Sequence, residues 1–378
     1  MPELMHERKL KVAYVIRLSL NQMDGIGRKV RDQILAWREA GVDTRLLAFV
    51  NVDGEGMDDV CGWRLTLASD KTCLVVRKIQ RTIQFLKGAG IIFFWRPDII
   101  YTRAGSRHWG SFLWKCSGAE RVIELNAAIE SEIVSLLRVG QIDERESYAR
   151  RQAWKKSMLE ADGYVSVSYE IEKQNKEWMG DKPHTVVWNS IDFSKYDNIN
   201  RTNSANKLPK VVFVGAADYE WNGLDKLLDL ARKTVGLIEY VVIGVWPSTE
   251  VPENVEVHPF LDKEELPMIL ASCDVGMATL ALHRKGLEEA SPLKVREYAA
   301  LGMPTIVSYD ETPFHEEAMP AWILRIPNSE TSITESLRAI ITFADNWKGK
   351  AFDRDEARSF FHAEIVEQRR TAFFDKIK

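Results

Sequence analysis

Residues 289–304 read EASPLKVREYAALGMP, and this stretch carries the clearest local structural signal in the chain. Ser291 is a favourable N-cap residue, and Pro292 then stands at the first helical position. Gly302 can take the left-handed conformation that ends a helix. The pattern therefore predicts a helix of about ten residues, followed by a short strand over residues 305–308.

The N-terminus of this helix suits an anion, because unpaired N–H groups and the positive end of the helix dipole lie there. The first residues, Ser291, Pro292, Leu293 and Lys294, would surround a group such as a diphosphate, and the lysine can add a point charge. Glu297 shares a helix face with Lys294. It lies roughly 6–8 Å along the helix from the cap, about the separation of a diphosphate from the ribose hydroxyls of a nucleotide.

The same residues also fit an ordinary helix with no ligand. Lys294 and Glu297 would then form a surface ion pair on a capped amphipathic helix. Glu289 lies eight residues before Glu297, and two glutamates at that spacing are common by chance. Taken alone, the stretch leaves the two interpretations open.

The stretch also resembles the C-terminal signature of the two-domain GT-B glycosyltransferases, especially glycosyltransferase family 4. In that family a Glu-x7-Glu pair opens a helix that ends in A-x-G-x-P-V/I-V. Here the pair is Glu289 and Glu297, and the helix ends with Ala300, Gly302 and Pro304. The form SPLK is close to a subset of the family that reads SPLK-x-x-EY. The resemblance implies an α/β fold with two facing Rossmann-like domains, parallel sheets, and a C-terminal helix crossing back to the N-terminal domain.

Segments elsewhere in the chain follow the order that such a fold requires. Residues 10–16 and 97–102 read as buried strands of a first domain, and residues 211–214 begin a second alternation of strands and helices. We therefore place an N-terminal, acceptor-side domain at 1–196, a C-terminal, donor-side domain at 209–352, and the returning helix at 353–378.

Composition limits the class of protein. A net charge of −4 gives no general attraction to nucleic acid. The four cysteines form no CxxC motif, which disfavours a zinc site or a disulfide framework and fits a reducing cytosol. No signal peptide is evident, and the longest apolar run, residues 89–95, is too short to span a membrane. We expect a cytoplasmic protein, and leave open a peripheral attachment to the inner face of a membrane.

A loop with Gly25 and Gly27 is expected between the first strand and a helix over about residues 28–40. The full GxGxxG motif is absent, because position 30 is Val. The two glycines would either let the backbone approach a donor phosphate or an acceptor, or form an ordinary turn with positive φ.

Residues 71–88 predict an amphipathic, basic helix. Val75, Ile79, Ile83 and Leu86 fall on one helical stripe. One interpretation packs this stripe on the core, and the other places the segment against an anionic membrane surface. The basic residues of the segment are Lys71, Arg77, Lys78, Arg81 and Lys87.

Polar residues near the ends of two first-domain strands are candidates for the acceptor side. Arg103 follows the strand at 97–102, and Glu124 and Asn126 lie in a segment that resembles the E-x-N-A of a family-4 subset. The carboxyl ends of strands face the ligand crevice in open α/β sheets. The alternative is that these polar groups only anchor loops.

Two cations that family-4 members use to hold the diphosphate are missing here. After the strand that ends at Gly215, which we expect to approach the donor, the family has an Arg and then Lys-Gly. This chain has Ala216-Ala217 and Asn222-Gly223 at those places. Either the site is rebuilt around Lys294 and the helix dipole, or donor binding is weak or lost. The other cations that can help are Arg284 and Lys285.

A metal site is not expected. Asp353-Arg354-Asp355 matches the DxD motif of a different glycosyltransferase fold, but no single-Rossmann pattern supports that function. We interpret this motif as a solvated helix start. No other clustering of His, Asp or Glu suggests metal binding.

The resemblance implies a hexosyltransferase that moves a sugar from a nucleoside-diphosphate sugar to a hydroxyl acceptor, with retention and without a metal. UDP-sugar is the favoured donor and GDP-sugar the next. Lys294 would stabilise the leaving diphosphate, Glu297 would hold the ribose, and Glu289 would contact the sugar. The acceptor would be a glycan or a lipid-linked sugar of cell-envelope or exopolysaccharide synthesis. The alternatives are a non-catalytic GT-B subunit supporting a partner transferase and a GT-B sugar-nucleotide epimerase.

Overall fold

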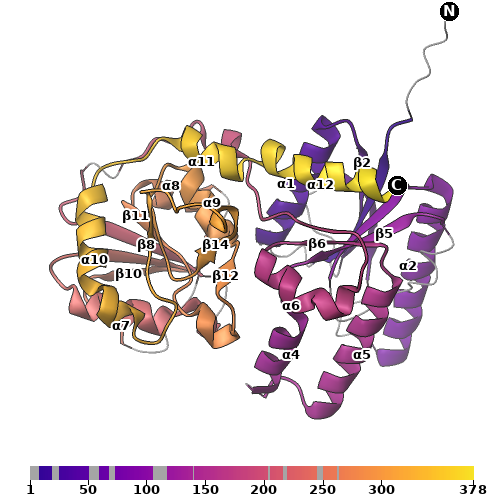
Figure 1. The fold of residues 1–378 in the computed structure, drawn as a ribbon, viewed down its shortest axis with the longest axis horizontal. Helices are drawn as coiled ribbons and strands as arrows, with labels where there is room; N and C mark the ends of the chain where they lie inside the picture. The colour runs from indigo at the N-terminus through magenta and orange to yellow at the C-terminus, as the bar shows by residue number, and fades with distance from the viewer. Residues whose placement is uncertain are drawn as a thin grey trace, which may run out of the picture. The chain divides into compact units, whose positions relative to one another are not determined.

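The computed structural model describes residues 8–18, 25–50, 59–67, 73–104, 117–138, 140–202, 205–215, 219–244, 250–261 and 264–378. The chain divides into two compact units, shown in Figure 1. Unit 1 comprises Met1–Val187 with Val366–Lys378, and unit 2 comprises Trp188–Ile365. The predicted domain bounds at 1–196, 209–352 and 353–378 stay a prediction.

Unit 1 contains a parallel sheet in the order β3-β2-β1-β4-β5-β6-β7. Its central strands are continuous apolar runs because helices cover both faces of such a sheet. The strand order reverses between β1 and β4, and ligands bind at such a reversal in open α/β sheets. The strands are β1 (Lys11–Leu18), β2 (Asp43–Val50), β3 (Cys61–Thr66), β4 (Ile99–Arg103), β5 (Glu120–Leu125), β6 (Gly163–Ser166) and β7 (His184–Val186).

The helices of unit 1 differ from the sequence-based prediction at two places. The predicted glycine loop is wrong, because Gly25 and Gly27 form the first turn of α1 and neither has a positive φ. Glycine is compatible with helical φ, and the first N–H groups of a helix need no intrahelical partner. The basic helix continues to Trp95. The helices are α1 (Gly25–Glu39), α2 (Leu74–Trp95), α4 (Ile129–Arg138), α5 (Glu144–Glu160) and α6 (Tyr169–Met179).

The apolar stripe predicted on residues 71–88 does not pack on the core. Val75, Ile79, Ile83 and Leu86 are all exposed, while Phe85 on the opposite side is buried. The helix packs on the sheet through Phe85, Gly88 and Ile92, so its buried side is rotated away from the stripe. Residues 71–72 lie outside the described part of the chain.

The C-terminal segment returns to unit 1, as predicted, but as the second of two helices. Helix α11 (Arg354–Phe361) ends where His362 is extended and forms a β-bridge with Ile191. Helix α12 (Ala363–Ile377) then packs in unit 1, where Phe374 contacts Trp37 edge to face. The bridge at His362 is the reason that a single long helix does not form.

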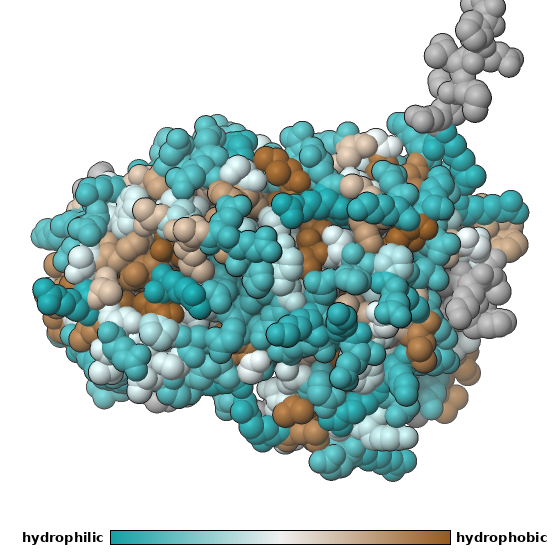
Figure 2. Space-filling model, viewed as in Figure 1, coloured by the Kyte–Doolittle hydropathy of each residue, from teal (hydrophilic) through white to brown (hydrophobic). Residues whose placement is uncertain are grey.

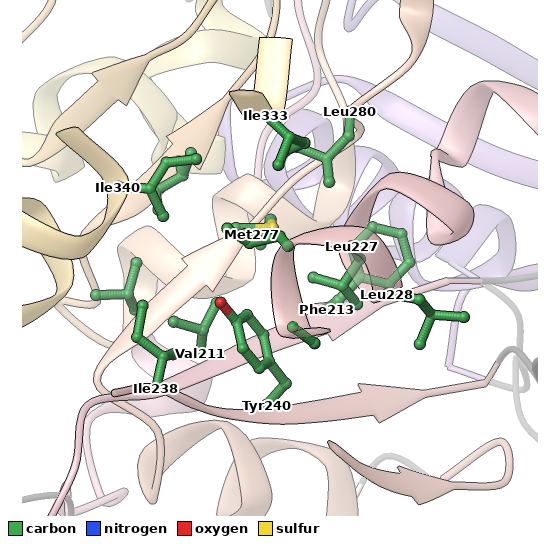
Figure 3. Packing of buried hydrophobic residues seen from close by; sticks show 14 of the residues in the cluster. Val211, Phe213, Leu227, Leu228, Ile238, Tyr240, Met277, Leu280, Ile333 and Ile340 are labelled. Atoms are coloured by element: carbon green, nitrogen blue, oxygen red, sulfur yellow. The ribbon is translucent and has the colours of Figure 1, made fainter. Parts of the chain in front are cut away.

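Unit 2 contains a second parallel sheet, in the order β10-β9-β8-β11-β13-β15. Its reversal lies between β8 and β11. Figure 3 shows the core on this sheet, where Phe213, Met277 and Leu227 pack together. The strands are β8 (Lys210–Val214), β9 (Glu239–Ile243), β10 (Val255–His258), β11 (Val275–Met277), β13 (Thr305–Val307) and β15 (Ile323–Arg325).

Helices and a small second sheet complete unit 2. The two-stranded sheet pairs β12 (Glu289–Ala290) with β14 (Asp310–Glu311) in parallel. Asp353 caps α11 by accepting from the Asp355 N–H, so the predicted helix start at the DxD motif is confirmed. The other helices are α7 (Leu224–Lys233), α8 (Glu265–Ala271), α9 (Leu293–Ala300) and α10 (Ser332–Trp347).

The surface seen in Figure 2 is mostly hydrophilic, and its hydrophobic residues form small separate patches. Among the helices that the structure describes, none combines the length and apolar character needed to cross a membrane.

Candidate functional site

The candidate donor site is the N-terminal end of α9, at the carboxyl edge of the unit 2 sheet. The helix starts at Leu293, so Pro292 holds the N-cap position with φ −77° and ψ 144°. The predicted cap at Ser291 is therefore wrong. The Ser291 hydroxyl instead accepts from the Asn189 N–H at 2.8 Å and from Arg296 Nη2 at 2.9 Å. Among the residues that the structure describes, no side chain caps α9, and its first N–H groups stay available to an anion.

Lys294 has a buried ammonium at this end of α9. Its Nζ makes no hydrogen bond in the described structure and lies 4.7 Å from the centre of the Phe213 ring. Part of the side chain remains accessible, but the charged atom does not. Burial lowers the pKa of Lys294 to about 8, and the nearby Glu297 partly opposes this shift. A buried ammonium without a partner is costly, so an anionic ligand would stabilise this site.

The two predicted glutamates are also buried in unit 2. Glu289 lies in β12 and is 4% exposed, and Glu297 lies on α9 and is 5% exposed. Glu297 acts electrostatically on Lys294, and Glu289 acts on Glu311 of the neighbouring strand. The structure therefore gathers these predicted residues around the start of α9.

A buried ion pair that sequence reasoning missed supports this end of α9. Arg296 Nη1 contacts Glu311 Oε2 at 2.6 Å, and both side chains are fully buried. Arg296 Nε also donates to the Asn189 carbonyl at 2.9 Å, and Tyr309 donates its hydroxyl hydrogen to Glu311 Oε1 at 3.0 Å. Arg296 lies within the quoted stretch, one turn after Pro292, but no spacing rule distinguished it from a surface arginine.

Asn189 adds a second unsatisfied polar atom near α9. Its amide donates to the Ser291 carbonyl, which fixes the side chain, while its Oδ1 is buried without a hydrogen-bond partner in the described residues. A ligand hydroxyl could donate to this oxygen. Asn189 belongs to the segment 186–192, whose sequence resembles a family segment, but that resemblance predicted no contact with α9.

Gly215 directly follows β8, at the same sheet edge as α9. Its N–H donates to the Ile243 carbonyl at 2.9 Å, and a side chain on Gly244 would meet the Gly215 carbonyl oxygen at 2.3 Å. The backbone is therefore tightly packed here. Ala216 and Ala217, which replace one of the family's cations, lie outside the described residues.

Arg284 and Lys285 have partners in the structure. Arg284 binds Asp225 and Glu330, each at 2.8 Å, and donates to the Glu220 carbonyl at 3.0 Å. Because these contacts already compensate its charge, Arg284 is not a free cation for binding a phosphate. Lys285 Nζ lies 4.9 Å from the centre of the Trp221 ring.

The three predicted acceptor-side residues come together in unit 1. Glu124 is fully buried and accepts from Lys29 Nζ at 2.7 Å, while Arg103 Nε lies 3.7 Å from the same oxygen. Lys29 also donates to Asn126 Oδ1 at 3.1 Å. Lys29 lies on α1 and was missed in the sequence, although a lysine four residues after the first glycine of α1 was a visible signal.

Further donors complete the shell of Glu124. Its Oε2 accepts from the Tyr101 hydroxyl at 2.7 Å and from Gln33 Nε2 at 3.2 Å, and Arg370 of α12 lies 3.5 Å away. Burial alone would raise the pKa of Glu124, but Lys29, Arg370 and Arg103 hold it well below its usual range. We call Glu124, Lys29, Arg103, Arg370, Tyr101 and Gln33 the unit 1 charge cluster.

The described ranges contain no group of three or more His, Cys, Asp or Glu side chains able to hold a metal ion. The metal-independent chemistry expected from the sequence stays a prediction.

The fold is that of the GT-B glycosyltransferases. Solved structures similar to this chain include sucrose-phosphate synthase from Thermosynechococcus elongatus, with 15% identity, a TM-score of 0.69, and 98% of this chain and 99% of that chain covered. HepE from Anabaena in complex with UDP-glucose has 12% identity, a TM-score of 0.67, and coverage of 97% and 100%. A glycosyltransferase from Rickettsia africae has 12% identity, a TM-score of 0.67, and coverage of 98% and 99%. No family model and no curated protein matches the sequence.

Proposed function

We propose that this chain is a glycosyltransferase that moves a sugar from a nucleoside-diphosphate sugar to a hydroxyl acceptor. The observation that carries the proposal is the buried ammonium of Lys294, which has no hydrogen-bond partner among the described residues, beside the N-terminus of α9, which no described side chain caps. A diphosphate would satisfy both at once. A UDP-sugar is the favoured donor, because HepE, which has the same fold, binds UDP-glucose; a GDP-sugar is the next candidate.

Each residue of the donor site has a role in this proposal. Lys294 and the first N–H groups of α9 stabilise the negative charge that develops on the leaving diphosphate. Glu297 accepts from the ribose hydroxyls, and Glu289 contacts the sugar near the reacting carbon. The acceptor oxygen attacks the anomeric carbon from the face of the leaving group, its proton passes to the departing phosphate oxygen, and the configuration is retained.

The proposed acceptor is a glycan or lipid-linked sugar of cell-envelope or exopolysaccharide synthesis, used at the cytoplasmic face of a membrane. Arg103 and Asn126, at the carboxyl edge of the unit 1 sheet, are the groups offered to it. Arg103 is supported by a buried Nη1 atom that has no hydrogen-bond partner among the described residues.

A second candidate function is a non-catalytic GT-B subunit that supports a partner transferase. The observation that favours it is that no free cation replaces the family's lysine at position 222 among the described residues. Asn222 stands where the related family has a lysine, and Arg284, close to it in the fold, is held by two carboxylates. Turnover of a donor by the pure chain would eliminate this alternative.

The first experiment is a thermal-shift panel with UDP, GDP, ADP and CMP, each with and without a chelator. A nucleotide at about 100 times its dissociation constant should stabilise the protein by about 2.7 kcal/mol, which gives a measurable shift in Tm. One nucleotide that shifts Tm regardless of chelator identifies the donor base and supports transfer without a metal. If no nucleotide shifts Tm, the non-catalytic function becomes the favoured proposal.

A further inference from the structure

Helix α2 presents an apolar face to solvent in unit 1. Val75, Ile79 and Leu86 are 62%, 56% and 55% exposed, and Phe94 is 82% exposed. Their successive spacings of four, seven and eight residues keep them on one side of the helix. The same side carries Val76, Ile83 and Phe93, which are 44%, 46% and 49% exposed.

The opposite side of α2 fixes the orientation of this face. Phe85 and Ile92 belong to a buried cluster on the unit 1 sheet. Gly88 brings the helix so close to the sheet that an added Cβ would lie 2.9 Å from Phe49. The helix therefore cannot rotate to bury its outer face without breaking this packing. A contiguous exposed apolar face of this kind marks an interaction surface.

The charge of α2 selects the partner. Between Leu74 and Trp95 there is no Asp or Glu, whereas four basic residues occur, in a chain whose net charge is −4. Lys78 and Lys87 are exposed, and Arg77 and Arg81 are partly exposed and contact neighbouring groups. Two copies of such a helix would repel each other, whereas an anionic surface would attract it.

We propose that α2 docks on an anionic lipid bilayer, with Phe93, Phe94 and the apolar face in the interfacial region and Lys78 and Lys87 among the headgroups. This geometry is that of a helix lying in the plane of the membrane surface. The surface belongs to unit 1 and contains none of the donor-site residues. It goes beyond the proposed transfer reaction, and it explains how the enzyme would meet a lipid-linked acceptor.

The test measures binding of the full chain to two kinds of vesicle by flotation. Vesicles of phosphatidylcholine alone are compared with vesicles that also contain phosphatidylglycerol. We expect binding only to the anionic vesicles, and a loss of at least about tenfold in Phe93→Ser/Phe94→Ser because the apolar anchor is removed. Lys78→Gln/Lys87→Gln should weaken binding about fivefold for each charge removed. Leu159→Ser is the matched control, because Leu159 is a 66% exposed apolar residue on α5 of the same unit.

UDP binding is measured in every variant to show that the fold is intact and to separate the two proposals. Vesicle binding without any nucleotide binding would support this inference while overturning the proposed donor site. Equal flotation of the wild type and the Phe93/Phe94 variant, or no flotation of the wild type, would overturn the inference. Wild-type dimerisation that the Phe93/Phe94 variant abolishes, measured by analytical ultracentrifugation, would also overturn it in favour of a second copy of the chain.

Discussion

Glu124 in unit 1 and Lys294 in unit 2 are both buried charged groups near the carboxyl edges of parallel sheets, but only one of them is satisfied. Both carboxylate oxygens of Glu124 accept hydrogen bonds from buried donors. The ammonium of Lys294 donates none in the described structure. The comparison indicates that Glu124 has a structural role, whereas Lys294 has a charge that a bound ligand would compensate.

The pKa shifts of the two groups follow the same contrast. Neighbouring cations overcome the burial of Glu124 and keep its pKa well below the usual range. For Lys294 burial dominates, and its pKa falls to about 8. A pKa that moves toward the neutral form indicates a charge that its surroundings compensate only in part, here through Glu297, and a diphosphate would supply the rest.

The largest expected effect is the loss of stability when the Glu124 carboxylate is removed. Glu124→Ala should lower the free energy of unfolding by about 3–5 kcal/mol, because it leaves Lys29 buried without its carboxylate and removes one of the two carboxylates that face Arg370, the other being Glu367. Chemical denaturation measures this effect. UDP binding under native conditions serves as the control and should persist. A loss below about 1 kcal/mol would contradict the structural role and return Glu124 to the acceptor site.

The next largest effect is expected at Lys294, where removal of the charge should stabilise the unliganded protein instead of destabilising it. Lys294→Met should reduce UDP affinity by about 100-fold, because a charge-assisted contact to the diphosphate is lost from a buried position. It should also raise the free energy of unfolding of the unliganded protein by about 1–3 kcal/mol, because an uncompensated buried charge is removed.

Calorimetric titration with UDP and thermal melts without ligand measure these two changes. Glu297→Gln is a useful comparison, since it removes the proposed ribose contact while leaving the lysine in place. Normal UDP affinity in both variants would refute the assignment of the donor site.

The sequence predicted the fold because its strongest signals are local. The apolar run at 10–16 predicts a strand, and the Ser-Pro…Gly-x-Pro pattern around α9 predicts helix ends, each from neighbouring residues alone. Gly302, with φ of 65°, ends α9 as predicted. The prediction fails where a distant residue intervenes. Ser291 does not cap the helix, because its hydroxyl accepts from Asn189, 102 residues away, and from Arg296, which no spacing rule marks.

The candidate site was only partly predictable for the same reason. Lys294 and Glu297 share one short helix, so periodicity brings them together. Glu311 lies in another element, and its pairing with Arg296 depends on how β14 meets α9. Likewise the amphipathic pattern at 71–88 gave the correct helix, but not which side would be buried. Phe85, Gly88 and Ile92 set that orientation by packing on the unit 1 sheet, and none of them belongs to the predicted stripe.

The pH dependence of binding and of stability should run in opposite directions. The folded-state pKa of Lys294, about 8, lies below the usual value for lysine near 10.5. Between these values the unfolded chain binds a proton that the folded chain does not, so stability rises with pH in this window. UDP affinity should instead fall by up to about tenfold per pH unit above pH 8, because the ammonium is lost.

Difference curves between the wild type and Lys294→Met isolate this group from other buried lysines. The melts and titrations are run from pH 6.5 to pH 10, roughly the range over which the shifted lysine changes charge. If the two proteins show parallel curves, Lys294 does not titrate in this window and the contrast with Glu124 fails.

The smallest effect is expected at Arg284, a cation of unit 2 that already has carboxylate partners. Its substitution tests whether such a cation is needed for UDP binding. Arg284 is bound by Asp225 and Glu330 and by a backbone carbonyl, so its charge is already compensated on the protein surface. Arg284→Gln should change UDP affinity by less than about twofold and lower stability by no more than about 1 kcal/mol, since exposed ion pairs contribute little. The same titrations and melts used for Lys294→Met measure both quantities. A loss of UDP affinity comparable with that of Lys294→Met would mean that the carboxylates release Arg284 to the diphosphate. Pairing in the unliganded protein would then be a poor guide to which cations bind the donor.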